Sequence, residues 1–200
     1  MKKGLLIFLS ALSIFSLGGC ASTVGDNGTS TMYIEEAKLL EETRGEQSQE
    51  LDSNQKVYDF FVDGSVQNIH IDVYRLQDGR WERESGSEQT LQDTEGRVIV
   101  DLGNLAEELS VAIQEADVST SIACEADLNS EDMSSMGRMT STLSEKTDIT
   151  YGQEIPLVVQ IITSKDEIIS YDVEYFAHPE EYEKFGYECV QAITVTFNQE

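Results

Sequence analysis

Hydrophobic and polar residues alternate along most of the chain from residue 56 onward. In residues 69–74 three β-branched residues are separated by His, Asp and Tyr, a period of two that is typical of a strand with one buried face. Asp78 and Gly79 follow, and this pair favours a tight turn between two strands. The sequence therefore predicts a β-hairpin whose return strand covers residues 80–84.

Seven further apolar stretches predict strands joined by short loops. They are residues 97–102, 109–113, 118–124, 139–143, 155–163, 168–176 and 190–197. Many short strands with little helix favour an all-β fold, an antiparallel β-sandwich of the jelly-roll or immunoglobulin-like kind. Residues 102–116 also fit the 3.6-residue period of an amphipathic helix, but the strands on both sides favour a loop and a strand there.

The N-terminal part of the chain has a different composition. Residues 21–31 are small and polar without an apolar period, as in a flexible tether. Residues 32–50 combine good helix formers with a weak apolar stripe, which predicts a short helix. An extra edge strand over residues 32–40 is the alternative. We therefore expect a tether over residues 20–50, followed by a single sandwich domain over residues 51–200.

The first residues have the features of an export signal. A short basic start precedes an apolar run over residues 5–17, which is shorter than the roughly 20 residues of a membrane-spanning helix. The sequence Leu-Gly-Gly-Cys that ends at Cys20 resembles the lipobox of bacterial lipoproteins. The resemblance implies removal of residues 1–19 as a signal peptide and a diacylglyceryl group on the sulfur of Cys20. Such a chain is anchored by lipid to the extracytoplasmic face of the cell membrane.

The predicted hairpin carries a second resemblance. Residues 76–82 read Leu-Gln-Asp-Gly-Arg-Trp-Glu and are similar to hairpin turns in small lipoproteins of Gram-positive bacteria. The resemblance covers a short part of the chain. It implies the same compartment as the lipobox and the same β structure as the alternation, and it implies no activity.

The chain is strongly acidic. It has 38 acidic and 13 basic residues, a formal net charge of −25. Nucleic-acid binding depends on Lys and Arg side chains that neutralise phosphates, so this charge argues against a nucleic-acid partner. It also argues against a domain that lies flat on anionic lipid headgroups. Cations and neutral or basic partners remain open, as does a role of the charge in solubility alone.

Two cysteines follow Cys20. Cys124 and Cys189 both lie in apolar, strand-like stretches. A disulfide between them is permitted outside the cytoplasm, and two separately buried free thiols are the alternative. Neither cysteine has a basic neighbour in the sequence that would depress its pKa, which argues against a reactive thiol.

Motifs of catalysis and of metal binding are weak. The sequence contains no nucleophile elbow, phosphate loop or dinucleotide fingerprint. His70 and Asp72 share one strand face, but a zinc site needs three or four ligands. A calcium site is a candidate in residues 127–132, although the standard loop glycine and the later glutamate are missing. Its oxygen ligands would be Asp127, Asn129, Glu131 and Asp132. We expect no other cofactor.

An aromatic loop lies between the last two predicted strands. It carries Tyr182, Phe185 and Tyr187 among acidic residues and should lie at one end of the sandwich. Exposed aromatic side chains in such a loop can stack on sugars or anchor a protein partner. The alternative is that they fold back and cap the core. Trp81, in a strand of alternating character, is expected to pack on the core in the same way.

These features predict a lipid-anchored lipoprotein with a non-enzymatic interaction or binding domain. Its expected partners are the membrane, through the lipid on Cys20, and an envelope protein or glycan. An accessory carbohydrate- or solute-binding module is the alternative, and a hydrolase is a third possibility. A β-sandwich hosts many functions, so the fold alone does not select among them.

Overall fold

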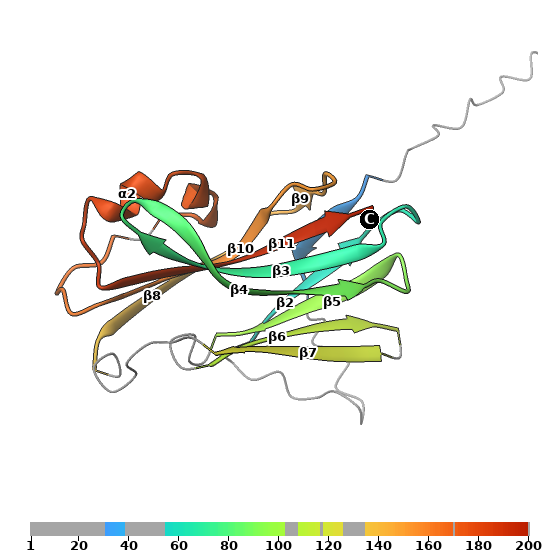
Figure 1. Cartoon of the computed structure of the whole chain (residues 1–200), viewed down its shortest axis with the longest axis horizontal. Coiled ribbons are helices and arrows are strands. Elements are labelled where there is room, and N and C mark those ends of the chain that lie inside the picture. Colours follow the sequence, from blue (N-terminus) through green and yellow to red (C-terminus); the bar gives the residue numbers. More distant parts are fainter. Residues whose placement is uncertain are drawn as a thin grey trace, which may run out of the picture.

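The computed structural model describes residues 31–38, 55–102, 108–116, 118–125, 135–169 and 171–199. In these residues almost all regular structure is strand (Figure 1). The first strands are β1 (Tyr33–Glu36), β2 (Gln55–Phe61), β3 (Asn68–Gln77), β4 (Arg80–Thr90), β5 (Glu95–Asp101) and β6 (Glu108–Glu115). The others are β7 (Val118–Glu125), β8 (Gly137–Thr142), β9 (Thr147–Asp148), β10 (Ile155–Thr163) and β11 (Cys189–Asn198). Two short helices, η1 (Val173–Ala177) and α2 (Pro179–Glu183), precede β11.

The strands form the expected antiparallel β-sandwich. The first sheet has the order β7-β6-β5-β2-β1-β9 and the second sheet the order β4-β3-β11-β10-β8. Every pairing in both sheets is antiparallel. The chain passes between the sheets several times, so residues far apart in sequence share each face. The prediction of an all-β sandwich is therefore confirmed.

The β3–β4 hairpin is turned by the residues that predict it. Asp78 and Gly79 both have positive φ, 48° and 71°, as a type I′ turn requires. The turn also touches α2, because a Cβ atom on Gly79 would lie 2.3 Å from Glu183 Oε2. The hairpin is longer than predicted, since β4 continues to Thr90.

Alternating side chains of both sheets fill the core between them. Tyr58 and Phe60 of β2 and Ile69 and Ile71 of β3 are almost completely buried. Phe60 needs the small residue beside it, because a Cβ atom on Gly96 would lie 2.5 Å from the Phe60 ring. The same Cβ would lie 2.9 Å from a backbone oxygen of β6, which cannot move without breaking the sheet. The core therefore fixes a glycine in β5.

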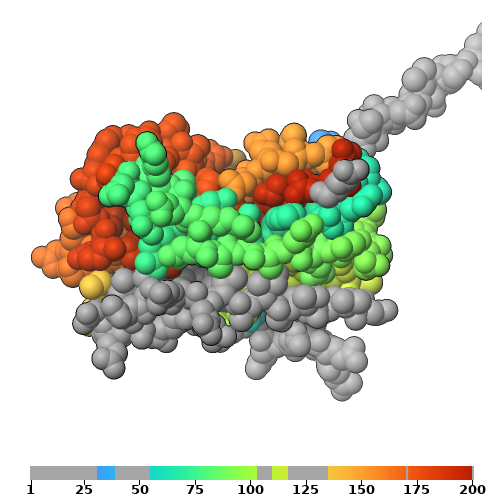
Figure 2. Space-filling view, in the orientation of Figure 1, coloured from blue at the N-terminus to red at the C-terminus, as the bar shows by residue number. Residues whose placement is uncertain are grey.

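The segment between β10 and β11, which we call the cap, is a correction to the predicted strands. The sequence predicts a strand over residues 168–176, but the described residues 168–169 and 171–172 have no regular structure and residues 173–176 belong to η1. Both edges of β10 are already paired, with β8 and β11, so the cap cannot add to this part of the sheet. It covers the outer face of the second sheet instead, beside the β3–β4 hairpin (Figure 2).

The cap explains why β11 is buried on both faces. Val190 and Ala192 point away from the first sheet, yet they are 2% and 1% exposed. Val173 of η1 and Tyr182 of α2 are also buried. Ser141 Oγ donates to the backbone oxygen of a cap residue over 2.6 Å and ties the cap to β8. The sandwich thus has a third layer at this end.

The N-terminal part of the domain differs from the first expectation. Residues 33–36 are a strand and not a helix, so the alternative of an extra strand is the correct one. This strand is not at the sheet edge, because β1 pairs with β2 on one side and with β9 on the other. The sandwich therefore includes residues before position 51. Residues 108–115 are strand β6, so the prediction of a strand in this part of the chain is confirmed.

No helix within the described residues is long and apolar enough to cross a membrane.

Candidate functional site

The outer face of the first sheet carries side chains that the core does not use. In β2 the alternation that buries Tyr58 and Phe60 turns Asp59 and Phe61 outward. The antiparallel register places Arg97 of β5 opposite Asp59. It places Tyr33 of β1 opposite Phe61. Strand pairing therefore gathers charged and aromatic groups from three strands on one face.

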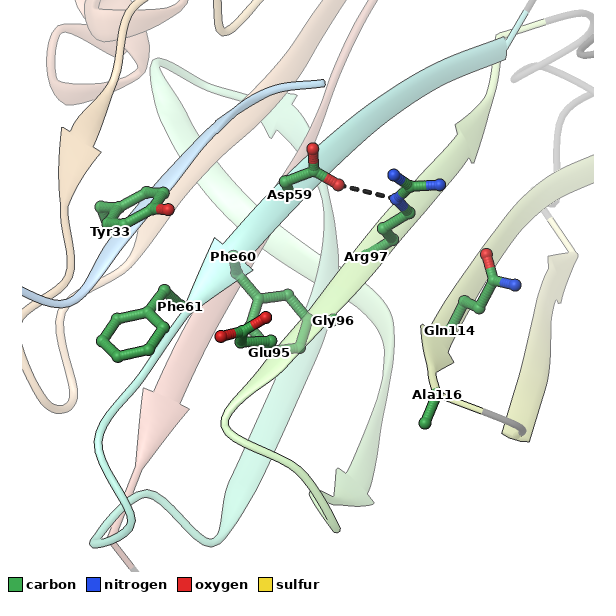
Figure 3. A pocket seen from close by; sticks show the side chains of 9 residues that line it. All are labelled: Tyr33, Asp59, Phe60, Phe61, Glu95, Gly96, Arg97, Gln114 and Ala116. Atoms are coloured by element: carbon green, nitrogen blue, oxygen red, sulfur yellow. Dashed lines mark hydrogen bonds and ion pairs between the residues drawn. The ribbon is translucent and has the colours of Figure 1, made fainter. Parts of the chain in front are cut away.

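These residues surround a shallow hollow of about 480 Å³ (Figure 3). Side chains of β1, β2, β5 and β6 and the turn after β6 line it, and the backbone of β2 and β5 runs beneath them. The lining residues are Tyr33, Asp59, Phe60, Phe61, Glu95, Gly96, Arg97, Gln114 and Ala116. The volume lies within the ~300–1,000 Å³ typical of small-molecule sites.

Asp59 and Arg97 form the polar centre of the hollow. Arg97 Nε donates to Asp59 Oδ1 over 2.7 Å. The two side chains are 41% and 52% exposed, so solvent reaches both. Among the described residues neither Arg97 Nη atom nor Asp59 Oδ2 has a protein partner. The pair therefore presents ordered donors and acceptors to the hollow.

Aromatic rings form one wall. The rings of Tyr33 and Phe61 stack with their centroids 6.0 Å apart and an angle of 24° between their planes. Lys146 Nζ lies 3.1 Å from the centroid of the Tyr33 ring, a cation–π contact, and 3.8 Å from Glu35 Oε1. These contacts restrict the Tyr33 ring, which in turn holds the ring of Phe61.

The aromatic loop singled out in the sequence lies in the cap, on the other sheet. Tyr182 is 1% exposed and packs edge-on against Trp81, with ring centroids 5.9 Å apart. Burial raises the pKa of Tyr182 far above its usual value. Phe185 and Tyr187 stack on each other with centroids 5.5 Å apart, and Tyr187 Oη accepts a hydrogen bond from the backbone N–H of Ile169. These contacts make the loop part of a packed layer.

The candidate metal ligands either form ion pairs with neighbouring side chains or lie, like Cys20, outside the described residues. Asp72 pairs with Arg83, and His70 Nε2 lies 3.4 Å from Glu88 Oε1. Within the described part of the chain no group of three or more His, Cys, Asp or Glu side chains could hold a metal ion. Cys20 and the calcium candidates Asp127, Asn129, Glu131 and Asp132 lie outside the described residues.

Cys189 is a buried free thiol. It is 3% exposed and is not part of a disulfide. Burial raises the pKa of its thiol to about 11, and Arg75 and Glu84 have smaller, opposing effects. Cys124 lies in β7 of the other sheet, and its side chain is outside the described part. Cys189 therefore matches the alternative of a buried free thiol and not that of a disulfide.

Comparison with known proteins adds no relative. No family model, no curated protein and no solved structure matches the chain.

Sequence reasoning did not single out the hollow. Asp59, Phe61 and Arg97 stand at outward positions of strands, which alternation could have indicated. Their convergence depends on the pairing of β2 with β5 and β1, and this pairing has no local signal in the sequence.

Proposed function

We propose that the chain is a lipid-anchored, extracytoplasmic binding protein that contacts another envelope component through the outer face of its first sheet. The observation that carries the proposal is the hollow, where an exposed Asp59–Arg97 pair lies beside the stacked rings of Tyr33 and Phe61. Ordered polar groups that converge beside apolar surface are typical of binding sites. The proposed role is non-enzymatic.

The proposed anchor and the hollow lie near each other in the chain. Tyr33 begins β1 and also lines the hollow. The lipobox resemblance places the lipid on Cys20, thirteen residues earlier. Because an extended chain spans at most ~3.3–3.6 Å per residue, Tyr33 would stay within about 45 Å of the lipid. The proposed partner is therefore a component of the zone directly outside the membrane.

The charge of the chain supports the same choice of partner. With a net charge of −25, the domain is repelled by anionic headgroups and by polyanions. The hollow itself is lined by two carboxylates, Asp59 and Glu95, and by one guanidinium group, Arg97. Its local charge is thus only slightly negative, which favours a partner without large net charge.

Binding of the full-length chain to isolated cell envelopes tests the proposal. Phe61→Ala and Arg97→Gln should each weaken binding about tenfold or more in a co-sedimentation assay. Arg83→Gln is the matched control, because Arg83 is 53% exposed and pairs with Asp72 on the outer face of the second sheet. Unchanged folding is checked by circular dichroism. Equal binding by all three variants and the parent chain would contradict the proposal.

A further inference from the structure

We infer that the ligand of the hollow is a neutral glycan chain built of pyranose rings. The inference rests on the proposed function and names the class of ligand for the same site. Three properties of the hollow lead to it: the mixture of donors and acceptors, the restrained aromatic wall and the spread of the lining residues over four strands.

The polar groups in the hollow match hydroxyl groups. Arg97 offers N–H donors, Asp59 and Glu95 offer carboxylate acceptors, and the amide of Gln114 offers both. An anion would need donors alone, and a cation would need acceptors alone. A sugar hydroxyl donates and accepts, so a lining with both kinds of group on neighbouring strands satisfies it. Vicinal hydroxyls can bridge Asp59 and Arg97, which are already held together.

The aromatic wall matches the apolar face of a sugar ring. Phe61 is only partly buried, and its ring stacks on Tyr33. Tyr33 is itself held by the Lys146 ammonium group, 3.1 Å from the ring centroid. A ring fixed before binding loses little conformational entropy when a ligand packs on it. The C–H groups of a pyranose can therefore pack on Phe61 while its hydroxyls reach the polar centre.

Charge separates this ligand from two others. The carboxylates of Asp59 and Glu95 and the net charge of −25 disfavour polyanions. The guanidinium group of Arg97, which already pairs with Asp59, disfavours a cationic side chain at the polar centre of the hollow. A neutral polymer is repelled neither by the carboxylates nor by the guanidinium group.

The arrangement of the lining residues favours a chain over a single sugar. They come from four neighbouring strands of one sheet face and from the turn after β6, so the hollow runs across the strands. It is shallow, and solvent reaches the Asp59 and Arg97 side chains at its centre. An internal unit of a polymer can rest there while the chain enters on one side and leaves on the other.

Two glycan probes test the inference with the full-length chain. The first is a soluble hexamer of β-1,4-linked N-acetylglucosamine, measured by titration calorimetry. The second is insoluble peptidoglycan, measured by co-sedimentation before and after its anionic secondary polymers are removed. We expect binding to both probes, retention on the stripped peptidoglycan, and at least tenfold weaker binding for Phe61→Ala and Arg97→Gln. The Arg83→Gln control should bind like the parent chain.

The outcomes separate the inference from the proposed function. Failure of the parent chain to bind either probe would overturn the glycan ligand, as would loss of binding when the anionic polymers are stripped. Binding of an oligolysine peptide that depends on Phe61 would also overturn it, in favour of a cationic peptide. If envelope binding requires Phe61 but survives digestion of the glycan strands, the glycan inference falls and the proposed function stands. If envelope binding is indifferent to Phe61, the proposed function itself falls.

Discussion

The hydroxyl group of Tyr58 donates a hydrogen bond to the backbone oxygen of Leu157 over 3.0 Å and joins the two sheets through the core. Leu157 lies at an irregularity of β10, where the register with β11 shifts between Pro156 and Val158. The same oxygen accepts a hydrogen bond from the backbone N–H of Leu143 over 2.9 Å. Because Tyr58 is completely buried, burial raises the pKa of its hydroxyl far above the usual value.

Tyr58→Phe should destabilise the domain by about 1 kcal/mol. The substitution removes one buried hydrogen bond and keeps the ring, and the oxygen of Leu157 still accepts from Leu143. Urea unfolding followed by circular dichroism measures the change. Tyr151→Phe is the control, because Tyr151 is 37% exposed and its hydroxyl bonds to Asp63 at the surface. An equal loss in both variants would show that the inter-sheet bond has no special contribution.

Trp81→Ala should cost roughly 2–3 kcal/mol, somewhat less than the ~3–5 kcal/mol of a fully buried tryptophan. The indole stacks on Phe176 with centroids 5.0 Å apart, and its Nε1 donates to the backbone oxygen of Phe176 over 2.7 Å. Trp81→Phe keeps a ring and loses the hydrogen bond, so it should cost about 1 kcal/mol. Urea unfolding measures both.

The Trp81 variants test how the cap is attached to the β3–β4 hairpin, and Met139→Ala is their control. Met139 is 37% exposed and lies on β8, so its loss should change the free energy of unfolding by less than about 0.5 kcal/mol. If Trp81→Ala and Met139→Ala had the same free energy of unfolding, the contacts of the indole with Phe176 would not stabilise the cap.

The stability of the domain should depend on Glu188 at neutral pH and not in acid. Hydrogen bonds from the hydroxyls of Ser164 and Thr163 lower the pKa of Glu188 from 4.5 to about 2. Because the pKa is lower in the folded chain, the contribution is present above about pH 4.5 and is lost as the pH falls toward 2. Glu188→Gln should therefore lower the free energy of unfolding at pH 7 and differ less from the parent chain at pH 2.5.

Unfolding of both proteins by urea at pH 7, 4.5 and 2.5 gives this comparison. Glu82→Gln, at an exposed position of β4, is the control. A difference between Glu188→Gln and the parent chain that is the same at all three pH values would contradict a role of the ionised carboxylate.

Cys20→Ala should prevent lipidation of the chain. The lipobox resemblance assigns the acceptor sulfur to Cys20, and two acyl chains give stable anchoring where one is marginal. In a bacterial host grown with a labelled fatty acid, the parent chain should carry label and fractionate with membranes. The variant should be unlabelled and uncleaved. A variant that remains labelled would show that lipid is attached elsewhere or that the lipobox is not used.

The strands could be predicted where one face of a strand is buried. Alternation located β3, β5 and β6, and the Asp-Gly pair located the hairpin turn. The prediction failed in residues 168–176, because apolar residues that cover a sheet from outside resemble residues within a sheet. It also failed in β1, since its helix-forming residues take the strand conformation that pairing with β2 and β9 imposes.

The candidate site could not be predicted because it is a product of topology. Tyr33, Phe61, Arg97 and Gln114 come from four different strands, and nothing in the local sequence of any one of them indicates the other three. The aromatic cluster that composition did indicate, around Tyr182, is absorbed by packing against Trp81 and the second sheet. The composition of the sequence thus indicated where aromatic residues gather. The pairing of strands determines which aromatic side chains face solvent beside charged groups.

Carboxylate footprinting of the full-length chain, with and without isolated envelopes, tests most directly that the first sheet presents the binding face. Asp59 has a 41% exposed side chain in the hollow, and Glu95 also lines the hollow. Glu88, 51% exposed on β4, reports on the outer face of the second sheet. The account predicts that envelopes protect Asp59 and Glu95 from carbodiimide labelling and leave Glu88 unchanged. Protection of Glu88 with continued labelling of Asp59 would contradict it.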